Sequence, residues 1–490
     1  MDRASGILMH ISSLPSNYFI GSLGKEAEKF ASFLHDSGQK YWQILPLNPI
    51  DAENSPYSSS DSFAGNIYLI DIEKLVEDNF LELVDLEEIP ISKMYITDYK
   101  KAREIKDKLL LISYNKFKIR NKLDEYEEFV FENKSWLNDY ALFMSLFDYF
   151  KKQWDEWPLP LVKRNKKTIL EYQEKLEKEI DYYKYVQYLF YKQYNDFKNM
   201  LKKYDIKLIG DIPMYVSYNS VDVWKNQKSF LLNQNRKPKY LSGASPDSMS
   251  VKGQLWGNPI YDYNIMRKNN YKFWRNRIKH ASRLCDVLRI DHFRAFDSYY
   301  IIPSHNKDAS KGHYIKGEGK KLLDVIIKSA KNCEIIAEDL GDIPQSVMKL
   351  RNYYKIPGMK ILQFAFNNDS KNPYLPHNYE KNCVAYLGTH DNEIISRWWN
   401  NLDNDTKRQV YSYSGIETEH ELNRKLMKLL SRSNASLVIF SIQDVIGDIN
   451  LKRMNTPGIA KGNWGFMLNP NLIDESIISY LSSLSKLFNR

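Results

Sequence analysis

Short apolar segments that end in charged or polar side chains recur along the whole chain. Eight of them can be recognised, at residues 5–11, 41–46, 207–216, 286–293, 333–340, 359–366, 383–391 and 435–444. A nearly continuous apolar body is typical of a parallel strand that is covered on both faces. Segments with apolar residues at helical spacing, such as 27–34 and 321–330, separate most of these runs. This alternation predicts an α/β fold, a (β/α)8 TIM barrel with its active site at the C-terminal ends of the strands.

Two segments interrupt the barrel pattern. Residues 73–205 are rich in Lys, Glu and aromatic residues at helical spacing, which predicts a mainly helical insertion. Its aromatic-rich stretch 136–157 suggests a stacking surface for sugars or bases, but helical spacing favours core packing. Residues 217–262 are predicted as a loop insertion that lines the active site, with irregular chain over 243–259. We predict a single catalytic unit over residues 1–490, because barrels with insertions reach this length.

The composition, with 43% hydrophobic and 27% charged residues, is typical of a globular protein. A net charge of +9 raises the question of nucleic-acid binding, but 70 basic residues are offset by 61 acidic ones. The densest basic run, residues 163–167, has no phosphate-binding or RNA-binding motif around it. A solvated face is the favoured interpretation of this run, and we expect no nucleic-acid partner.

The sequence indicates neither export nor membrane insertion. No apolar run approaches the roughly 18 residues that cross a bilayer. The apolar patch at residues 7–9 is too short for a signal peptide. Cys285, Cys333 and Cys383 are widely spaced beside predicted strands, which favours buried thiols over disulfides or a zinc site. We therefore expect a cytoplasmic protein with no membrane partner.

The run at residues 286–296 carries the densest candidate chemistry of the chain. Side chains two residues apart share a face of an extended strand, so Arg289 and Asp291 are expected to point the same way. A guanidinium beside a carboxylate favours the ionised form, which suits a nucleophile. A buried structural ion pair at a strand end is the alternative interpretation of the same two residues.

Six of the eight runs end on or beside a strongly polar group, namely His10, Asp211, Asp291, Glu338, Asp391 and Asp444. Unpaired carboxylates are costly in a barrel interior, so several at one end indicate a functional site. A carboxylate-bound metal and glycoside cleavage by paired carboxylates are the two chemistries that fit. The metal is disfavoured because no cluster of histidines or D-x-D group stands at these ends. Glycosidic chemistry fits Asp291, Glu338 and Asp391, although composition does not distinguish Glu338 from its neighbour Asp339.

Motifs along nearly the whole chain resemble those of the amylomaltases, which are 4-α-glucanotransferases or disproportionating enzymes of the α-amylase clan, glycoside hydrolase family 77. They are Ser5-Gly-Ile-Leu-Met-His-Ile11, Tyr41-Trp-Gln-Ile-Leu-Pro46, Ser55-Pro-Tyr57, Gly210-Asp-Ile-Pro213, Gly253-Gln-Leu-Trp-Gly-Asn-Pro259, Arg289-Ile-Asp-His-Phe-Arg294, Ala337-Glu-Asp-Leu-Gly341 and Gly388-Thr-His-Asp-Asn392. Each motif alone is weak evidence, whereas all of them in this order are specific.

The resemblance implies roles for the three carboxylates. Asp291 would be the nucleophile that forms a β-glucosyl-enzyme intermediate. Glu338 would protonate the leaving oxygen and later deprotonate the incoming acceptor. Asp391 would bind hydroxyls of the distorted donor sugar and stabilise the transition state. Adjacent barrel strands can hold a nucleophile and an acid/base at the separation that a retaining double displacement requires.

The resemblance also implies roles for four residues around the carboxylates. Arg289 would keep Asp291 ionised, and His390 would lie beside the third carboxylate. Tyr57 would stack on the donor glucose, since its ring offers apolar area to a sugar, and Asp211 would shape that subsite.

Three further residues, Gln254, Trp256 and Asn463, are implied as contacts along the glucan path. A loop-anchoring core residue is the alternative interpretation of Trp256. The chain departs from the family pattern near its C-terminus. Where the family usually has Asn-Trp followed by an aromatic residue and Arg, this sequence reads Asn463-Trp-Gly-Phe-Met467. Loss of that Arg affects local packing or an outer contact and leaves the central carboxylates in place.

Taken together, the residues and the resemblance predict a hexosyltransferase that moves α-1,4-glucan segments between malto-oligosaccharides. An α-glucan hydrolase with the same carboxylates, and a non-catalytic glucan-binding barrel, are the alternatives. The mechanism uses carboxylates alone and the chain has no metal or nucleotide motif, so no cofactor or metal is expected. Monomer and homodimer are both compatible with the sequence.

Overall fold

Eight parallel strands form a closed barrel at the centre of this computed structural model, which describes residues 1–119, 124–246 and 250–490. Around the barrel the strand order is β1, β12, β11, β10, β9, β6, β3, β2. In chain order the strands are β1 (Ala4–Leu8), β2 (Tyr41–Gln43), β3 (Lys207–Ile212), β6 (Val287–Ile290), β9 (Glu334–Ala337), β10 (Gly358–Ile361), β11 (Cys383–Tyr386) and β12 (Leu437–Ser441). Each of the eight predicted runs overlaps one strand, which confirms the (β/α)8 barrel.

The register of the barrel aligns the polar ends of neighbouring strands. Asp211 of β3 pairs with Arg289 of β6, and Ile290 of β6 pairs with Ala337 of β9. All barrel pairings are parallel, so the residues that follow these strands emerge at one end of the barrel. The side chains of Asp291 and Glu338 come directly after β6 and β9 and belong to that end.

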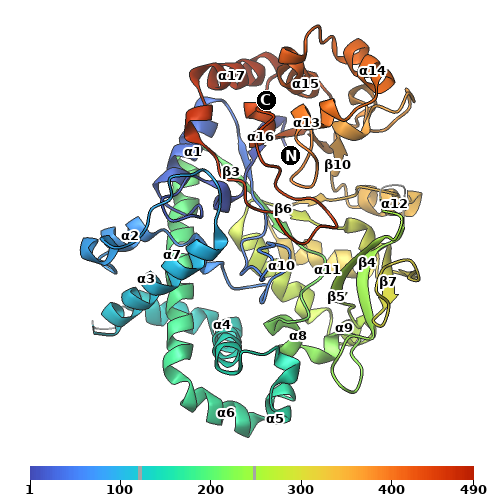
Figure 1. Ribbon diagram of the computed structural model, residues 1–490. Helices are drawn as coiled ribbons and strands as arrows, with labels where there is room; N and C mark the ends of the chain where they lie inside the picture. The colour runs from blue at the N-terminus through green and yellow to red at the C-terminus, as the bar shows by residue number, and fades with distance from the viewer. Residues whose placement is uncertain (120–123, 247–249) are drawn as a thin grey trace.

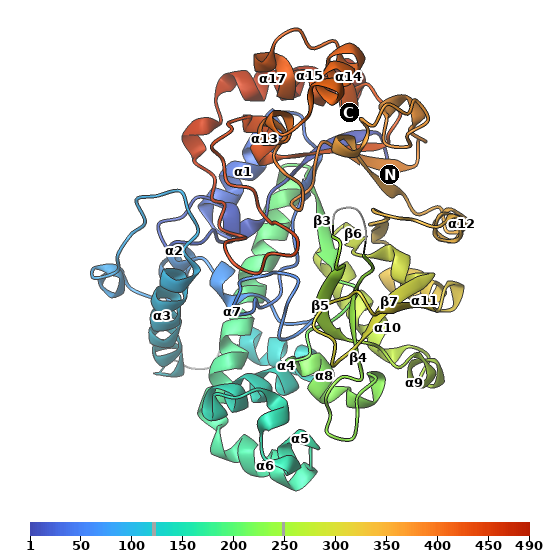
Figure 2. The same ribbon diagram turned by 45° about the vertical axis from the view of Figure 1, so that its right-hand side comes forward.

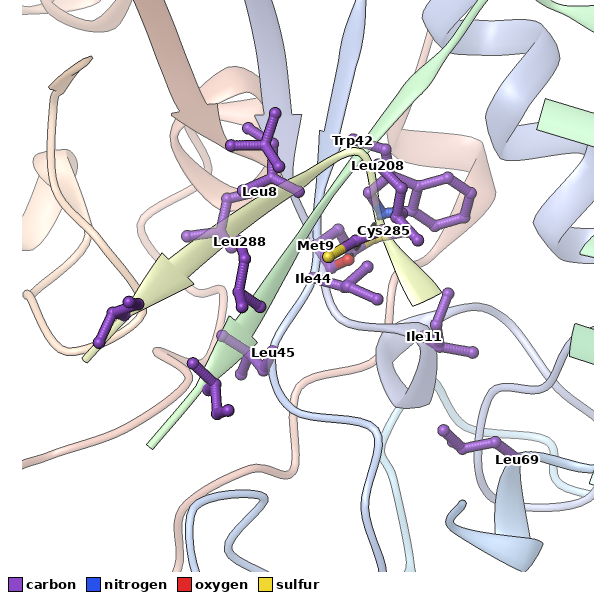
Figure 3. Packing of buried hydrophobic residues seen from close by; sticks show 14 of the residues in the cluster. Leu8, Met9, Ile11, Trp42, Ile44, Leu45, Leu69, Leu208, Cys285 and Leu288 are labelled. Atoms are coloured by element: carbon purple, nitrogen blue, oxygen red, sulfur yellow. Dashed lines mark hydrogen bonds between the residues drawn. The ribbon is translucent and has the colours of Figure 1, made fainter. Parts of the chain in front are cut away.

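The apolar bodies of the strands form the core. Figure 3 shows Leu8 of β1, Trp42 of β2, Leu208 of β3 and Leu288 of β6 in one buried cluster. Each of these side chains has 4% or less of its surface exposed. Burial of an aliphatic side chain of this size contributes about 1.5–3 kcal/mol. The strands are therefore held by packing on both of their faces, and their polar ends remain available for chemistry.

Helices cover the barrel between its strands. They are α1 (Lys25–Asp36), α10 (Lys272–Leu284), α11 (Lys320–Ala330), α12 (Gln345–Tyr353), α13 (Ile395–Asn400), α14 (Asn404–Ser414), α15 (Leu422–Ser431), α16 (Ile442–Ile446) and α17 (Glu475–Phe488). Helices α13, α14, α15 and α17 gather at one end of the molecule in both views (Figures 1 and 2). Among the described residues, none of the helices combines the length and apolarity that a bilayer crossing needs.

The segment from residue 73 to residue 205 contains a second group of helices, separate from those that cover the barrel between its strands. They are α2 (Ile72–Glu77), α3 (Tyr99–Ile119), α4 (Asp124–Phe150), α5 (Leu159–Val162), α6 (Lys166–Lys175) and α7 (Glu177–Lys203). Helix α7 packs along α4 and also contacts α1 beside the barrel. The aromatic side chains of Trp136, Trp154 and Trp157 are buried, which confirms that this stretch is core. Residues 120–123 of the predicted insertion lie outside the described residues.

A second, four-stranded antiparallel sheet lies beside the barrel in the order β5, β4, β7, β8. Its strands are Tyr240–Ala244 (β4), Gln254–Pro259 (β5), Ser298–Pro303 (β7) and His313–Lys316 (β8). The expectation of irregular chain over 243–259 is wrong where β4 and β5 run; residues 247–249 lie outside the described residues. Strand β4 pairs with the apolar strand β7, which follows more than fifty residues later. Strand formation here depends on that distant partner.

The three cysteines are free and buried, as the sequence predicts. Cys285 and Cys333 precede β6 and β9, and their sulfur atoms lie 3.9 Å apart. The hydrogen bond with the Cys333 thiol and burial raise the pKa of Cys285, so the Cys285 sulfur is a protonated packing group.

Candidate active site

Backbone hydrogen bonds carry the barrel ladder one residue past its strands and thereby place two carboxylates. The Asp291 amide donates to the carbonyl oxygen of Ile212 at 3.1 Å, and the Glu338 amide donates to that of Ile290 at 3.0 Å. Each acidic side chain thus starts from a backbone position fixed by the neighbouring strand. Four of the carboxylates at or beyond the strand ends in this part of the barrel are Asp211, Asp291, Glu338 and Asp391.

Arg289 joins two of these carboxylates. Its Nη1 lies 2.6 Å from Asp211 Oδ2 and its Nη2 lies 3.0 Å from Asp291 Oδ1. This contact confirms that Arg289 and Asp291 share a face of the strand. The Asp211 side chain is fully buried, whereas 31% of the Asp291 side chain is exposed. Asp211 is therefore the structural partner of the arginine, and Asp291 is the carboxylate that a ligand can reach.

The electrostatic environment of Asp291 combines opposing effects. Burial raises the pKa of this carboxyl, the Arg289 guanidinium lowers it and the charge of nearby Asp391 raises it, with the result that the pKa lies above its usual value. The Arg289 charge also lowers the pKa of Glu338, but among the described residues no cation forms an ion pair with Glu338. The direct hydrogen bond from Arg289 favours ionisation of Asp291 over ionisation of Glu338.

Glu338 is held by two backbone amides. Its Oε2 accepts from the His292 amide at 2.7 Å, and its Oε1 accepts from the Leu340 amide at 3.1 Å. His292, which donates the first of these bonds, adopts a left-handed backbone conformation (φ 52°). Burial and the charge of Asp291 together raise the pKa of Glu338 to about 8, so it is protonated at neutral pH.

Asp339, which composition does not distinguish from Glu338, has a different environment. Its Oδ2 accepts from Arg351 Nη1 at 2.5 Å and its Oδ1 accepts from the Met359 amide at 2.8 Å. Both side chains of the Asp339–Arg351 pair are 5% exposed. Asp339 is thus committed to a buried ion pair with α12, and Glu338 alone of the two is placed beside Asp291.

Tyr57, His390 and Asp391 complete the polar chain. Tyr57 donates its hydroxyl proton to Asp211 Oδ2 at 2.6 Å, and the Tyr57 hydroxyl oxygen lies 2.9 Å from His390 Nε2. Because that proton is already given to Asp211, His390 Nε2 is the donor to Tyr57. His390 Nε2 also lies 3.3 Å from Asp391 Oδ2, and burial lowers the pKa of His390, which keeps the ring neutral. The Tyr57 and His390 rings are stacked at 5.4 Å.

His10 and Asp444 are the other two polar groups at strand ends. Their side chains accept hydrogen bonds from backbone amides and do not join the hydrogen-bonded group of Tyr57, His390 and Asp391. His10 Nδ1 accepts from the Leu45 amide at 3.2 Å, and burial lowers the pKa of His10 to about 3. Asp444 accepts from the Ile395 amide at 2.8 Å at the start of α13, and burial raises its pKa to about 6. Their polarity supports the scaffold behind the site.

The arrangement provides two carboxyl groups at adjacent strand ends, of which, in the part of the chain that the structure describes, only Asp291 is hydrogen-bonded to a guanidinium. Glu338 is a proton donor at neutral pH, and Asp291 is paired with a fixed cation. Environments that separate the pKa values of two carboxyl groups indicate one acid and one nucleophile or base. Cleavage of a glycosidic bond requires such a pair of carboxyl groups.

Sequence comparisons with known proteins identify a family that carries out this type of chemistry. The glycoside hydrolase family 77 model, described as 4-alpha-glucanotransferase, matches residues 9–472. The chain belongs to the 4-alpha-glucanotransferase family. It is 39% identical to the 4-alpha-glucanotransferase of Clostridium butyricum over 98% of this chain and 100% of the relative. It is also 39% identical to that of Aquifex aeolicus over 94% of both chains.

Solved structures of the family share the fold. The amylomaltase from Streptococcus agalactiae in complex with acarbose is 34% identical and superposes with a TM-score of 0.96. The match covers 100% of this chain and 99% of that structure. The insertions therefore belong to the family architecture as much as the barrel does.

The second sheet carries two of the residues that the family resemblance implies as glucan contacts, Gln254 and Trp256 of β5. The Trp256 indole donates to Gln254 Oε1 at 3.0 Å and its ring lies edge-on to His292 at 4.8 Å. Trp256 is 37% exposed, which argues against a purely loop-anchoring role. Contact of both side chains with a glucan stays a prediction.

Asn463 makes its hydrogen bonds within its own loop. Its Oδ1 accepts from the Thr456 amide at 3.0 Å and its Nδ2 donates to the Ile459 carbonyl oxygen at 2.6 Å. The side chain thus closes the turn between residues 456 and 463. Glucan contact at Asn463 also stays a prediction.

The departure from the family pattern at residues 465–467 lies in packing. Phe466 and Met467 are buried, and a Cβ on Gly465 would lie 2.9 Å from Lys452 Nζ. The preceding Trp464 ring lies 6.0 Å from the ring of Tyr57 and 6.2 Å from that of His390. The altered residues follow Trp464 directly along the chain, and among the described residues no hydrogen bond or ion pair joins their side chains to the carboxylates of the site.

Sequence reasoning missed Arg453 and Asn455, which contact Asp391 from the C-terminal loop. They stand in an irregular polar stretch with no strand or helix to set a periodicity. The nearest signal was the Asn463 motif, eight residues further along the same loop.

Proposed function

We propose that the chain cleaves an α-1,4 bond of a malto-oligosaccharide and transfers the donor segment to the 4-hydroxyl of another glucan. The observation that carries this proposal is the contrast between Glu338, whose pKa is raised to about 8, and Asp291, which is paired with Arg289. Members of the family are named for this transfer.

In the first step, Asp291 Oδ2, the oxygen that Arg289 does not hold, attacks the anomeric carbon of the donor sugar. The glycosidic C–O bond breaks as the leaving oxygen takes the proton of Glu338. The products are a glucosyl ester on Asp291, an ionised Glu338 and a released fragment with a free 4-hydroxyl.

In the second step, Glu338 accepts the proton of the acceptor's 4-hydroxyl. The acceptor oxygen attacks the anomeric carbon on the face opposite to the ester, and Asp291 leaves as a carboxylate. Two inversions restore the α configuration, and both carboxyl groups return to their starting protonation states.

The remaining groups bind and orient the donor sugar. Asp391 is 41% exposed at its side chain, so its oxygens are available to sugar hydroxyls that gain partial charge near the transition state. Tyr57 is fixed by Asp211 and His390, which presents a preorganised ring to the donor glucose. No step calls for a metal or cofactor.

Incubation with maltotriose tests the activity. We expect a ladder of shorter and longer malto-oligosaccharides plus glucose at a constant number of reducing ends, because transfer conserves the number of glycosidic bonds. Product sizes are followed by chromatography and reducing ends by a colorimetric assay. A rise in reducing ends with shorter products alone would identify a hydrolase, and an unchanged substrate that still binds would identify a glucan-binding barrel.

The pH profile of kcat/KM for maltotriose tests the acid assignment. We expect a bell-shaped curve, since Glu338 must hold its proton and Asp291 must be ionised in the free enzyme. Activity falls above about pH 8 as Glu338 loses its proton and falls on the acid side as Asp291 gains one. Measurements run from about pH 5 to about pH 10. Activity that continues to rise beyond about pH 9 would contradict the role of Glu338 as acid.

A cytoplasmic location and a monomeric or homodimeric state stay predictions from the sequence. Malto-oligosaccharides and longer α-1,4-glucans are the partners that this proposal names.

A further inference from the structure

We propose that Asn455 is a positioning residue for Asp391, which it holds in the orientation that the donor sugar requires. The proposal deepens the proposed function and rests on it, because it takes Asp391 as the carboxylate that meets the sugar hydroxyls. Nothing in the sequence pattern singled out Asn455.

Two partners hold the two carboxylate oxygens of Asp391. Asn455 Nδ2 donates to Oδ1 at 2.6 Å, and His390 Nε2 lies 3.3 Å from Oδ2. Asp391 lies beyond the end of β11, and 41% of its side chain is exposed. Without Asn455 the carboxylate keeps one weak contact on one side and can rotate about its side-chain bonds.

Asn455 is itself fixed to the segment that carries Asp391. Its backbone amide donates to the His390 carbonyl oxygen at 3.0 Å. Arg453 Nε donates to the Asn455 carbonyl oxygen at 2.8 Å, and its Nη2 donates to the Asp391 carbonyl oxygen at 2.7 Å. Arg453 Nη1 also lies 3.5 Å from Glu393 Oε2. These contacts tie the loop at 453–455 to residues 390–393.

A neutral amide suits this position. A hydrogen bond to a carboxylate is stronger and shorter than one between neutral groups, so it fixes geometry well. A lysine or arginine here would compensate the charge of Asp391, which the carboxylate needs in order to stabilise positive charge in the donor sugar. The same logic does not apply to Asp291, which is held by the Arg289 cation.

The first test compares Asn455→Ala with Asn450→Ala. A displacement of about 1 Å in a catalytic group can cost about 10²-fold in rate. We expect Asn455→Ala to lower kcat for maltotriose disproportionation by about 10²-fold with KM changed by less than about threefold. Asn450 lies in the same loop, and among the described residues its side-chain amide donates only to Asp448, so its variant should match the unaltered protein. A kcat within about twofold of that control would overturn the proposal.

The second test uses Asn455→Asp, which keeps the shape and removes the donor. At high pH two carboxylates would face each other and repel. At low pH the pair would share one proton, and the restored O–H would donate across the same contact. We expect the ratio of variant to unaltered kcat to rise at least about tenfold from alkaline to acid pH. The titratable or charged groups around this contact are Tyr57, Asp291, His390, Glu393 and Arg453.

The outcomes separate a positioning role from a structural one. If Asn455 only stabilises the loop, both variants lower the melting temperature and the Asn455→Asp ratio does not change with pH, which would overturn the proposal. If the unaltered protein forms no ladder from maltotriose, the proposed function fails. If the unaltered protein forms the ladder and both variants match it, the positioning proposal alone fails.

Discussion

Replacement of Asp291 by Asn is expected to lower turnover of maltotriose by at least about 10⁴-fold, which is about 5.5 kcal/mol of transition-state stabilisation. The amide keeps the shape of the side chain and can still accept from Arg289, but it lacks the charge that forms the glucosyl ester. Initial rates from purified Asp291→Asn and unaltered protein provide the measurement. Binding of maltotriose, followed by calorimetry, should persist because the other sugar contacts are unchanged.

Asp342→Asn is the matched control for this experiment. Asp342 lies four residues after Glu338, in the loop beyond β9. Its side chain is 94% exposed, and its Oδ2 lies 3.9 Å from Arg294 Nη1. We expect this control to retain the activity of the unaltered protein. Equal activities of Asp291→Asn and Asp342→Asn would remove Asp291 from the mechanism, whatever the fold of the two variants.

Replacement of Glu338 by Gln is expected to lower turnover of maltotriose by about 10³–10⁴-fold, because general acid–base catalysis contributes on that scale. The loss should depend on the leaving group. With α-maltosyl fluoride as donor, fluoride leaves without protonation and a maltosyl ester on Asp291 still forms. Added azide then attacks the anomeric carbon without a general base, Asp291 leaves, and α-maltosyl azide is released.

Two comparisons make this result specific to Glu338. Glu334→Gln places the same change at the opposite end of β9, where Glu334 is 44% exposed at its side chain and pairs with the amino terminus, and it should leave turnover unchanged. Asp291→Asn should form no azide product, since it lacks the nucleophile. Failure of azide to restore product formation in Glu338→Gln would contradict the assignment of this residue as acid and base.

The same geometry explains why Arg289 is central to the site. It links Asp211, which is fully buried, to Asp291, which is partly exposed. The cation thus anchors the site to the barrel interior and favours ionisation of the nucleophile. Both interpretations of the sequence therefore apply to Arg289: it forms a buried structural ion pair with Asp211, and it favours the ionised form of the accessible Asp291.

The barrel and three carboxylates could be predicted because their signal is local. An apolar body with a polar end identifies β6 and β9 as buried parallel strands, and a period of two places Arg289 and Asp291 on one face. Once eight such runs are counted, closure of the barrel brings their ends together. The family resemblance then assigned roles that periodicity cannot assign.

The second sheet shows where local signals end. Strands β4 and β5 contain Gly and Pro residues that predict irregular chain, yet β4 pairs with the apolar strand β7. The partner lies far along the chain, and strand preference depends on packing against such neighbours. Gln254 and Trp256 therefore owe their position to a sheet that composition does not indicate.

The sequence by itself determined the barrel, its catalytic end and the carboxylates that enter it, because alternation of apolar and polar residues depends only on neighbours along the chain. Composition left Glu338 and Asp339 undistinguished and the family resemblance selected Glu338, whereas the physical reason comes from the tertiary structure, in which Arg351 of α12 and the Met359 amide bind the Asp339 carboxylate. The tertiary structure alone brought Asn455 to Asp391 across 64 positions of the chain. Contacts between distant loops are set by how the whole barrel closes, and no local pattern records them.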